Sequence, residues 1–149
     1  MFKIIPSFTF SGQCSQAIEL YKNAFGAEIK VKLLYSDANP NDFKYENEDE
    51  KNFIFHSQLK IGDQIIILSD DSGGMLSDDI QGKTGKTSLQ NLLVSFSSDV
   101  EFMKAYDVLS DGATIVVPIH STSYASCYTF LIDKFGGRWE LMSGHSSAN

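Results

Sequence analysis

The sequence predicts an α+β fold in which two βαβββ modules form curled mixed sheets around a cleft, with the helices on the outside. Three observations support this prediction. The expected elements follow the order β-α-β-β-β twice within 149 residues. Apolar and polar side chains alternate along several of the expected strands. The two halves are also weakly self-similar, because residues 21–29 correspond to residues 106–114, and residues 59–69 to residues 132–142.

Length and composition limit the domain organisation and the partners. We expect one domain, residues 1–149, with modules of about 1–71 and 88–143 that are linked by a loop at 72–87. The net charge of -7 and the lack of a basic run argue against nucleic acid and anionic membranes, because phosphate binding needs clustered Lys and Arg. Neither a transmembrane run nor a signal peptide is recognisable. The two cysteines lack metal-like spacing, which favours reduced thiols and a cytoplasmic protein.

The first module begins with an expected strand at residues 4–10, in which Pro6 requires an edge position or a bulge. Residues 14–25 carry apolar side chains at the three-and-four spacing of an amphipathic helix. Gly26 is suited to ending that helix. Residues 27–35 alternate apolar with charged side chains, which is typical of a half-buried strand.

The rest of the first module is expected to hold a long loop and a hairpin. The loop at 37–52 is polar and acidic, and loops of this length are either functional lids or mobile. Strands at 53–60 and 64–69 are joined by a hairpin turn. Alternation predicts that one face of the earlier strand carries Ile54, His56, Gln58 and Lys60.

The second module repeats this order with a strand at 89–96, a helix at 99–110 and a strand at 113–119. A loop at 120–125 then leads to a hairpin at 128–142. In the last strand, alternation sets Trp139 and Leu141 on one face and Arg138, Glu140 and Met142 on the other. If that second face is buried, the carboxylate of Glu140 requires a cation, a metal or a proton; otherwise it faces solvent.

Three segments carry a resemblance to a known family. They are Cys-Ser-Gln-Ala-Ile-Glu-Leu-Tyr-Lys-Asn-Ala-Phe-Gly-Ala-Glu at 14–28, Phe-His-Ser-Gln-Leu-Lys-Ile-Gly-Asp at 55–63 with Leu-Ser-Asp at 68–70, and Val-Pro at 117–118 through Asp-Lys-Phe-Gly-Gly-Arg-Trp-Glu at 133–140. The chain resembles the vicinal oxygen chelate superfamily of glyoxalases, bleomycin-resistance proteins and extradiol dioxygenases, and especially its PhnB-like branch. The resemblance covers nearly the whole chain. It implies the fold, whereas the activity varies within the superfamily.

The resemblance also implies a divalent metal as the possible cofactor. In the metal-using members, the ligands come from the first and last strand of each repeat. Carried over by position, they fall at Ile5 or Pro6, near Ile66 or Ile67, near Asn91 and at Glu140. Only Glu140 is a good ligand, and one carboxylate holds a divalent metal weakly. The residues present therefore favour weak metal binding or none.

Several side chains are candidates for a site in the expected cleft. His56 has two interpretations: a structural histidine, or a metal ligand or base that converges with Glu140. His56 and Glu140 are the candidate metal ligands. Tyr124 occupies the loop where PhnB-like proteins usually have a Trp, so it either closes the cleft or packs on its edge. The candidate ligand-binding residues are Phe8, His56, Gln58, Asn91 and Tyr124. His120 and His145 are expected in solvent, and Asp70 and Asp71 form either a solvated acidic turn or a cation site.

Two functions are compatible with these residues. The first is a small-molecule-binding protein of PhnB-like type, metal-free or weakly metal-binding, whose ligand the sequence does not identify. The alternative is a metal-dependent lyase, isomerase or dioxygenase-type enzyme of the glyoxalase superfamily. We also expect a homodimer, because residues 2–10 are apolar apart from Lys3 and would be poorly protected at a sheet edge. Small two-module relatives also commonly form dimers, as the resemblance implies.

Overall fold

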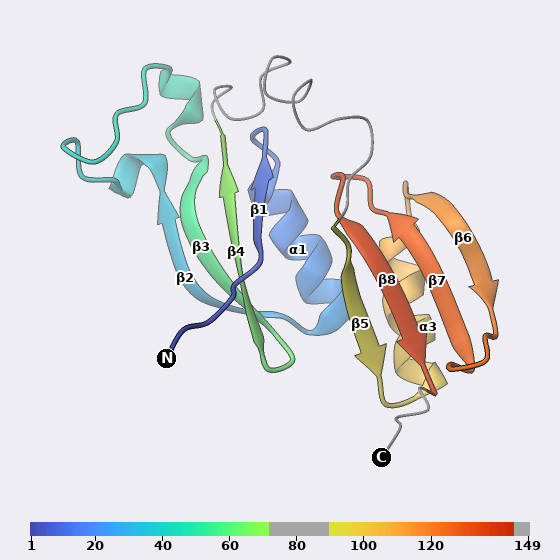
Figure 1. The fold of residues 1–149 in the computed structure, drawn as a ribbon. Coiled ribbons are helices and arrows are strands. Elements are labelled where there is room, and N and C mark those ends of the chain that lie inside the picture. The colour runs from blue at the N-terminus through green and yellow to red at the C-terminus, as the bar shows by residue number, and fades with distance from the viewer. Residues whose placement is uncertain (72–89, 145–149) are drawn as a thin grey trace. The chain divides into compact units, whose positions relative to one another are not determined.

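The computed structural model describes residues 1–71 and 90–144, and in each part a helix covers one face of a four-stranded mixed sheet (Figure 1). The chain divides into two compact units, Met1–Lys86 and Thr87–Asn149. Each unit contains a strand, a helix and three further strands in that order. The predicted α+β fold of two βαβββ modules is therefore confirmed, while the cleft between the modules stays a prediction.

The first unit has a sheet with the strand order β1-β4-β3-β2, in which β1 runs parallel to β4 and the other pairs are antiparallel. Its elements are β1 (Ser7–Phe10), α1 (Cys14–Phe25), β2 (Glu28–Leu34), β3 (Ile54–Ile61) and β4 (Gln64–Asp70). Two short 3-10 helices lie at the predicted loop of residues 37–52: η1 (Tyr35–Asp37) starts just before it and η2 (Glu48–Glu50) lies near its end.

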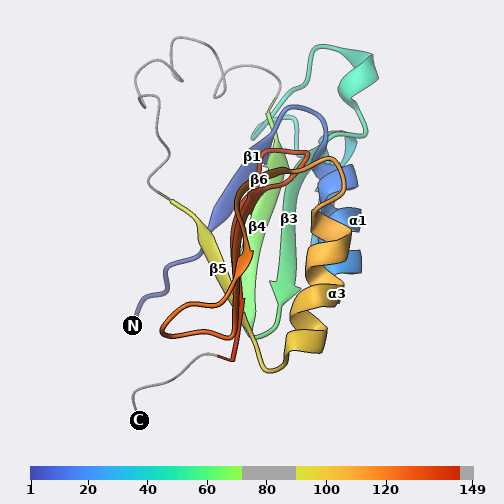
Figure 2. The same ribbon diagram turned by 90° about the vertical axis from the view of Figure 1, so that its right-hand side faces the viewer.

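The second unit repeats this arrangement with the strand order β5-β8-β7-β6, and Figure 2 shows its helix lying along one face of its own sheet. Its elements are β5 (Leu92–Phe96), α3 (Asp99–Leu109), β6 (Thr114–His120), β7 (Cys127–Ile132) and β8 (Arg138–Ser143). The predicted loop at 72–87, the start of the strand predicted at 89 and the predicted solvent position of His145 lie outside the described residues. No helix in the described ranges is long and apolar enough to span a membrane.

Two local departures from the predicted strands have clear physical causes. β1 begins at Ser7 rather than at residue 4, because Pro6 has no N–H group; its carbonyl accepts the Ile67 N–H at 2.9 Å. In β3, His56 pairs with Leu33 and Ile54 pairs with Leu34, so Phe55 is the extra residue of a bulge. The bulge reverses the alternation, and the prediction that Ile54 shares a face with His56 is wrong.

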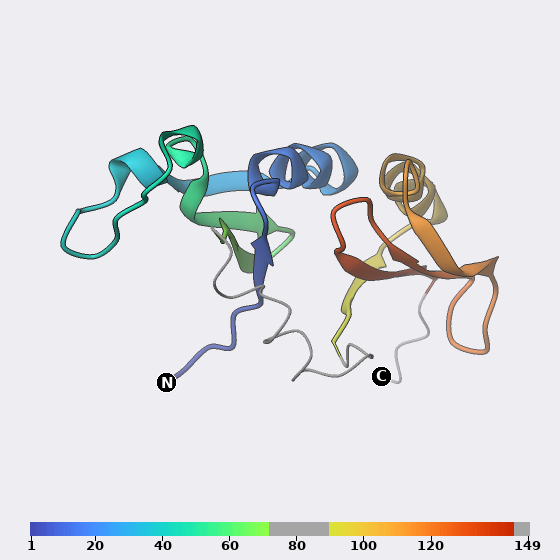
Figure 3. The ribbon, with the colours of Figure 1, turned by 90° about the horizontal axis from the view of Figure 1, so that it is seen from above.

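The core of each unit lies between its helix and its sheet (Figure 3). In the first unit, Tyr21 of α1 is fully buried, as are Leu59 and Leu68 on the helix-covered face of the sheet. In the second unit, Trp139 and Leu141 are buried on the corresponding face, as the alternation in β8 predicts. Among the residues that the structure describes, the opposite face of each sheet carries no helix of its own unit; we refer to these as the first and second open faces.

Asp70 connects three elements of the first unit through its carboxylate. Oδ1 accepts the N–H groups of Gly12 and Cys14 at 2.9 Å each, where α1 begins. Oδ2 accepts the Ile54 N–H at 2.9 Å, where β3 begins. The residue is only 8% exposed, so the expected solvated acidic turn or cation site is wrong for Asp70. Backbone N–H groups take the place of solvent or a cation around this charge.

The second unit makes the corresponding connection with a different set of side chains. Ser143 ends β8 at the position where Asp70 ends β4. Its hydroxyl donates to Asp99 Oδ1 in the first turn of α3 at 2.6 Å, and the hydroxyl of Ser126 donates to the same atom at 2.7 Å. These hydrogen bonds lower the pKa of the Asp99 carboxyl, that from Ser143 most. The carboxylate is on the helix here, whereas in the first unit it is on the strand.

We predict that Asp70→Asn destabilises the protein by about 2 kcal/mol, because one charged acceptor is replaced by an amide whose nitrogen cannot accept the backbone N–H groups. Chemical denaturation followed by circular dichroism measures the change. Asp42→Asn is the matched control, since Asp42 is exposed. Equal unfolding free energies for the two variants would contradict the structural role assigned to Asp70.

Candidate functional site

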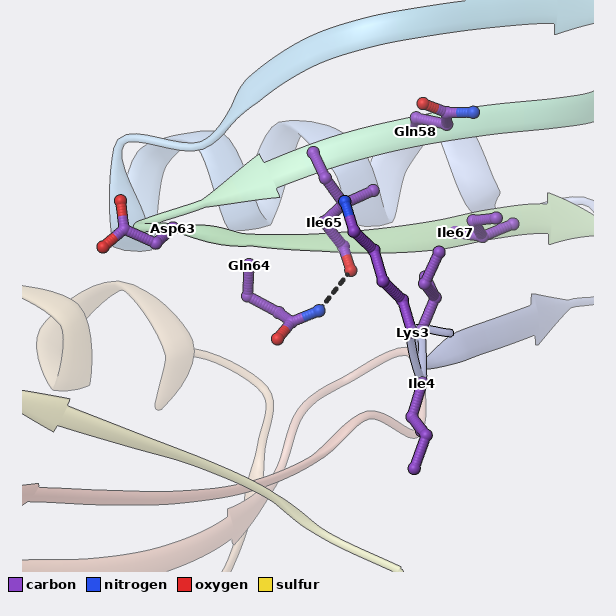
Figure 4. A pocket seen from close by; sticks show the side chains of 8 residues that line it. Lys3, Ile4, Gln58, Asp63, Gln64, Ile65 and Ile67 are labelled. Carbon is purple, nitrogen blue, oxygen red and sulfur yellow. Dashed lines mark hydrogen bonds between the residues drawn. The ribbon is translucent and has the colours of Figure 1, made fainter. Parts of the chain in front are cut away.

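The first open face carries a cavity of about 480 Å³ within the first unit (Figure 4). Its apolar lining comes from Ile65 and Ile67 of β4 and from Ile4 and Ile5 in the segment that precedes β1. Gln58 of β3, which pairs with Ile67, adds an amide. The remaining lining residues are Lys3, Asp63 and Gln64. The described lining is thus mixed, with four isoleucines and four polar or charged side chains.

His56 and Gln58 lie together on the first open face. The His56 Nε2 and Gln58 Nε2 atoms are 3.4 Å apart, and both side chains are half-buried. With the imidazole neutral and its proton on Nδ1, His56 Nε2 accepts from the amide nitrogen of Gln58. The amide oxygen of Gln58 is then left to accept a hydrogen bond from a ligand. The structure therefore brings together two of the five residues that the sequence predicts to bind a ligand.

Phe8 has a different environment. It pairs with Leu68, which is fully buried, so its side chain is on the helix-covered face of the sheet. Its ring contacts Tyr21 of α1, with the ring centres 6.5 Å apart. This position gives Phe8 a packing role, and Phe8 is not among the residues that line the cavity.

Glu140 lies on the second open face, where it accepts a short hydrogen bond. The distance from the Tyr128 hydroxyl to Glu140 Oε1 is 2.5 Å, and both residues are half-buried. Burial raises the pKa of the Tyr128 hydroxyl far above its ordinary value, and the hydrogen bond and charge of Glu140 raise it further. Tyr128 therefore keeps its proton at neutral pH and donates it to the carboxylate.

Two further rings contact Tyr128 on this face. The Tyr124 ring centre is 6.4 Å from that of Tyr128, with a 75° angle between the planes. The His120 ring is 5.7 Å away at 80°. Tyr124 is 44% exposed and His120 is exposed as expected, although His120 ends β6 instead of lying in a loop. The sequence analysis does not predict Tyr128 as a site residue. Its position diagonally across the β7–β8 hairpin from Glu140 could have indicated the contact between them.

Asn91 lies near the start of the described part of the second unit and forms a hydrogen bond with Arg138. Its side-chain oxygen accepts from Arg138 Nε at 2.9 Å. The guanidinium carbon lies 5.0 Å from the centre of the Phe130 ring. Asn91, Tyr124 and Glu140 thus belong to the second unit, and His56 and Gln58 to the first. The convergence of His56 with Glu140 stays a prediction.

The positions that correspond to the family's metal ligands do not fit a divalent metal. The resemblance places these ligands at Ile5 or Pro6, near Ile66 or Ile67, near Asn91 and at Glu140, which supply one carboxylate and one amide. In the sheet register, Glu140 pairs with Leu93 and its counterpart Ile67 pairs with Ser7, so the paired positions add only a hydroxyl. Metal sites require several N, O or S ligands. Across residues 1–71 and 90–144, no three His, Cys, Asp or Glu side chains are grouped closely enough to hold a metal.

No known family model matches the sequence. Among curated proteins, the chain is 27% identical over 145 residues to protein YjdN of Escherichia coli (strain K12), with 91% of each chain covered. A solved structure from Bacillus cereus, described as a putative 3-demethylubiquinone-9 3-methyltransferase, PhnB protein, has a TM-score of 0.75 at 20% identity and covers 96% of this chain and 100% of its own.

A glyoxylase/bleomycin resistance protein/dioxygenase domain from Frankia sp. EAN1pec is also similar, with a TM-score of 0.64 at 13% identity. The match covers 100% of this chain and 95% of the Frankia chain. These likenesses agree with the two-module architecture described above. The chain therefore shares the fold of these proteins, which include a PhnB protein and a glyoxylase/bleomycin resistance protein/dioxygenase domain.

Proposed function

We propose that the protein binds a small molecule with both apolar and polar groups in the cavity of the first open face. The observation that carries this proposal is the cavity itself, about 480 Å³, whose described lining combines four isoleucines with four polar or charged side chains. Small-molecule sites commonly have volumes of roughly 300–1,000 Å³ and combine apolar walls with polar groups that orient the ligand. The volume of this cavity lies in that range, and its lining offers both kinds of contact.

The lining suggests how such a ligand is held. Contact with Ile65 and Ile67 removes apolar ligand surface from water, and this supplies most of the affinity. The amide of Gln58 fixes the orientation of one polar group on the ligand, and His56 positions that amide. We therefore expect a ligand with an apolar body and at least one hydrogen-bond donor.

Binding without catalysis is favoured by the chemistry of the side chains. The alternative, a metal-dependent lyase, isomerase or dioxygenase-type enzyme, requires ligands around a metal, and Ile67 stands where the first unit would supply one. Among the described lining residues, Asp63 is the only acid, and it is exposed in a turn. A general acid or base requires a positioned side chain, which this lining does not offer.

We predict that Ile67→Trp fills the cavity and weakens binding of the fluorescent apolar probe 1-anilinonaphthalene-8-sulfonate by at least about tenfold, a loss of about 1.4 kcal/mol. A fluorescence titration measures the affinity, and cooperative thermal unfolding establishes that the variant is folded. Val100→Trp is the control, because Val100 is 79% exposed on α3 of the other unit. Equal affinities for wild type and Ile67→Trp would refute the proposed cavity site.

We also predict that protein purified without chelator contains less than about 0.1 equivalent of Zn, Ni, Mn or Fe, because Glu140 is the one strong ligand at the family's metal positions. Elemental analysis of wild type and Glu140→Gln tests this. A stoichiometric metal that disappears in Glu140→Gln would instead support the metal-dependent enzyme. His56→Gln then tests whether His56 is a second ligand.

We further propose that the protein is a homodimer that uses its N-terminal segment. β1 is an edge strand and pairs with β4 on one side. The segment before it exposes Phe2 by 87% and Ile4 by 85%. Exposed apolar residues beside an open sheet edge favour association, and closed two-fold symmetry is the commonest arrangement of oligomers. The net charge opposes association only weakly, since salt screens it within about 8 Å.

For this dimer, sedimentation equilibrium should give a mass about twice that of the 16.5 kDa chain. Replacing both Phe2 and Ile4 by Glu should shift the equilibrium toward monomer, because the buried apolar contact would be replaced by repelling charges. Val116→Glu serves as the control, since Val116 is 50% exposed on β6 of the other unit. A wild-type mass of a single chain at micromolar concentration would exclude the dimer.

We place the protein in the cytoplasm as part of the same proposal. Both cysteines are free thiols; Cys14 is buried and Cys127 is half-buried. Burial, followed by the nearby charge of Asp70, raises the pKa of the Cys14 thiol to about 12. A protonated, buried thiol is unreactive, and free thiols are usual in a reducing compartment.

A further inference from the structure

We propose that the second open face binds an organic ammonium ion, with Glu140 as its counter-ion and the rings of Tyr124, Tyr128 and His120 around it. This site uses residues of the second unit alone. It goes beyond the cavity of the first open face and does not depend on it. A tertiary or quaternary alkylammonium group is the ligand class that best fits the surroundings described below.

The first argument is the charge of Glu140. One of its oxygens, Oε1, accepts the Tyr128 hydroxyl at 2.5 Å. Within residues 1–71 and 90–144, Oε2 accepts no hydrogen bond, and the carboxylate makes no ion pair. A half-buried carboxylate with an open oxygen attracts a cation, because it has lost part of its hydration without gaining a charged partner.

Within the described residues, Arg138 forms no ion pair with Glu140, although it is two residues away on the same face. Its Nε atom donates to Asn91, and its guanidinium lies over the Phe130 ring. The guanidinium is thus engaged by Asn91 and Phe130. The contact with Phe130 also illustrates that this face accommodates a cation against an aromatic ring.

The second argument is the arrangement of the rings. The rings of Tyr124 and His120 stand at 75° and 80° to the ring of Tyr128, so each of them is nearly perpendicular to it. Aromatic faces attract ammonium ions through their negative quadrupole, and groups of such rings recognise methylated ammonium ions. The hydroxyl of Tyr128 donates to a carboxylate, which increases the electron density of that ring and strengthens the attraction.

The third argument separates an organic cation from a metal ion. Phe130 pairs with Glu140 and Met142 pairs with Tyr128, so both belong to this face. They are 8% and 7% exposed. Because the Arg138 guanidinium lies over the Phe130 ring, Met142 provides the apolar contact for a ligand on this face. A small hard cation would lose its water there and gain a single carboxylate as its oxygen donor. An alkylammonium ion instead places its methyl groups against Met142 and the rings and its charge near Glu140.

The test is a titration of the full-length, ¹⁵N-labelled protein with choline chloride, followed by NMR. Its control ligand is 3,3-dimethylbutan-1-ol, which has the same shape without the charge. We expect choline to shift amide signals of β7 and β8 near Tyr128 and Glu140 in a saturable manner, and the alcohol to bind at least about tenfold more weakly. Equal binding of the two ligands, or no shifts in these strands, would refute the site.

Variants test the assigned residues. Glu140→Gln keeps the shape of the side chain, and Tyr124→Leu changes an exposed loop residue that the fold does not need; each should weaken choline binding by about tenfold. Asp107→Asn removes the same charge from an exposed position on α3 and should leave binding unchanged. Wild-type affinity in Glu140→Gln would overturn the proposal. Binding to the cavity of the first unit is measured separately, with 1-anilinonaphthalene-8-sulfonate and the Ile67→Trp variant, so either proposal can fail without the other.

Discussion

Each unit depends on the attachment of its helix to the end of its last strand. In the first unit, Asp70 accepts three backbone N–H groups and thereby fixes the start of α1 and the start of β3. In the second unit, Asp99 on the helix accepts the hydroxyl of Ser143. Both solutions place a carboxylate at a helix N-terminus, where the helix dipole stabilises it. Because the helix is fixed to one face, the described part of each unit leaves the other face of its sheet without a helix.

The two open faces share a backbone plan but differ in side-chain chemistry. The same register position holds Ile67 in the first sheet and Glu140 in the second. The first face consequently combines aliphatic side chains with the amide of Gln58, whereas the second combines rings with a carboxylate. This divergence explains why the repeat is recognisable in the backbone order and weak in the sequence. The two positions also do not supply a matching pair of metal-binding side chains, since one is aliphatic and the other a carboxylate.

Features set by neighbouring residues could be predicted from the sequence, and those set by distant ones could not. The bounds of α1 follow from local apolar spacing and from Gly26, which ends the helix with a φ of 65°. The face of Trp139 follows from alternation. In contrast, the bulge at Phe55 arises from pairing with β2, and the role of Asp70 depends on N–H groups as far as 58 residues away. The Tyr128–Glu140 bond likewise required the pairing register of β7 and β8.

The hairpin of β7 and β8 contains a residue whose fluorescence can be used to follow unfolding. Asp133 accepts the indole N–H of Trp139 at 2.8 Å, and both side chains are buried. Trp139 is the only tryptophan in the chain. Its fluorescence therefore reports the environment of the second unit, while circular dichroism reports both units. Comparing the two signals during unfolding reveals whether the modules melt together or separately, without any introduced label.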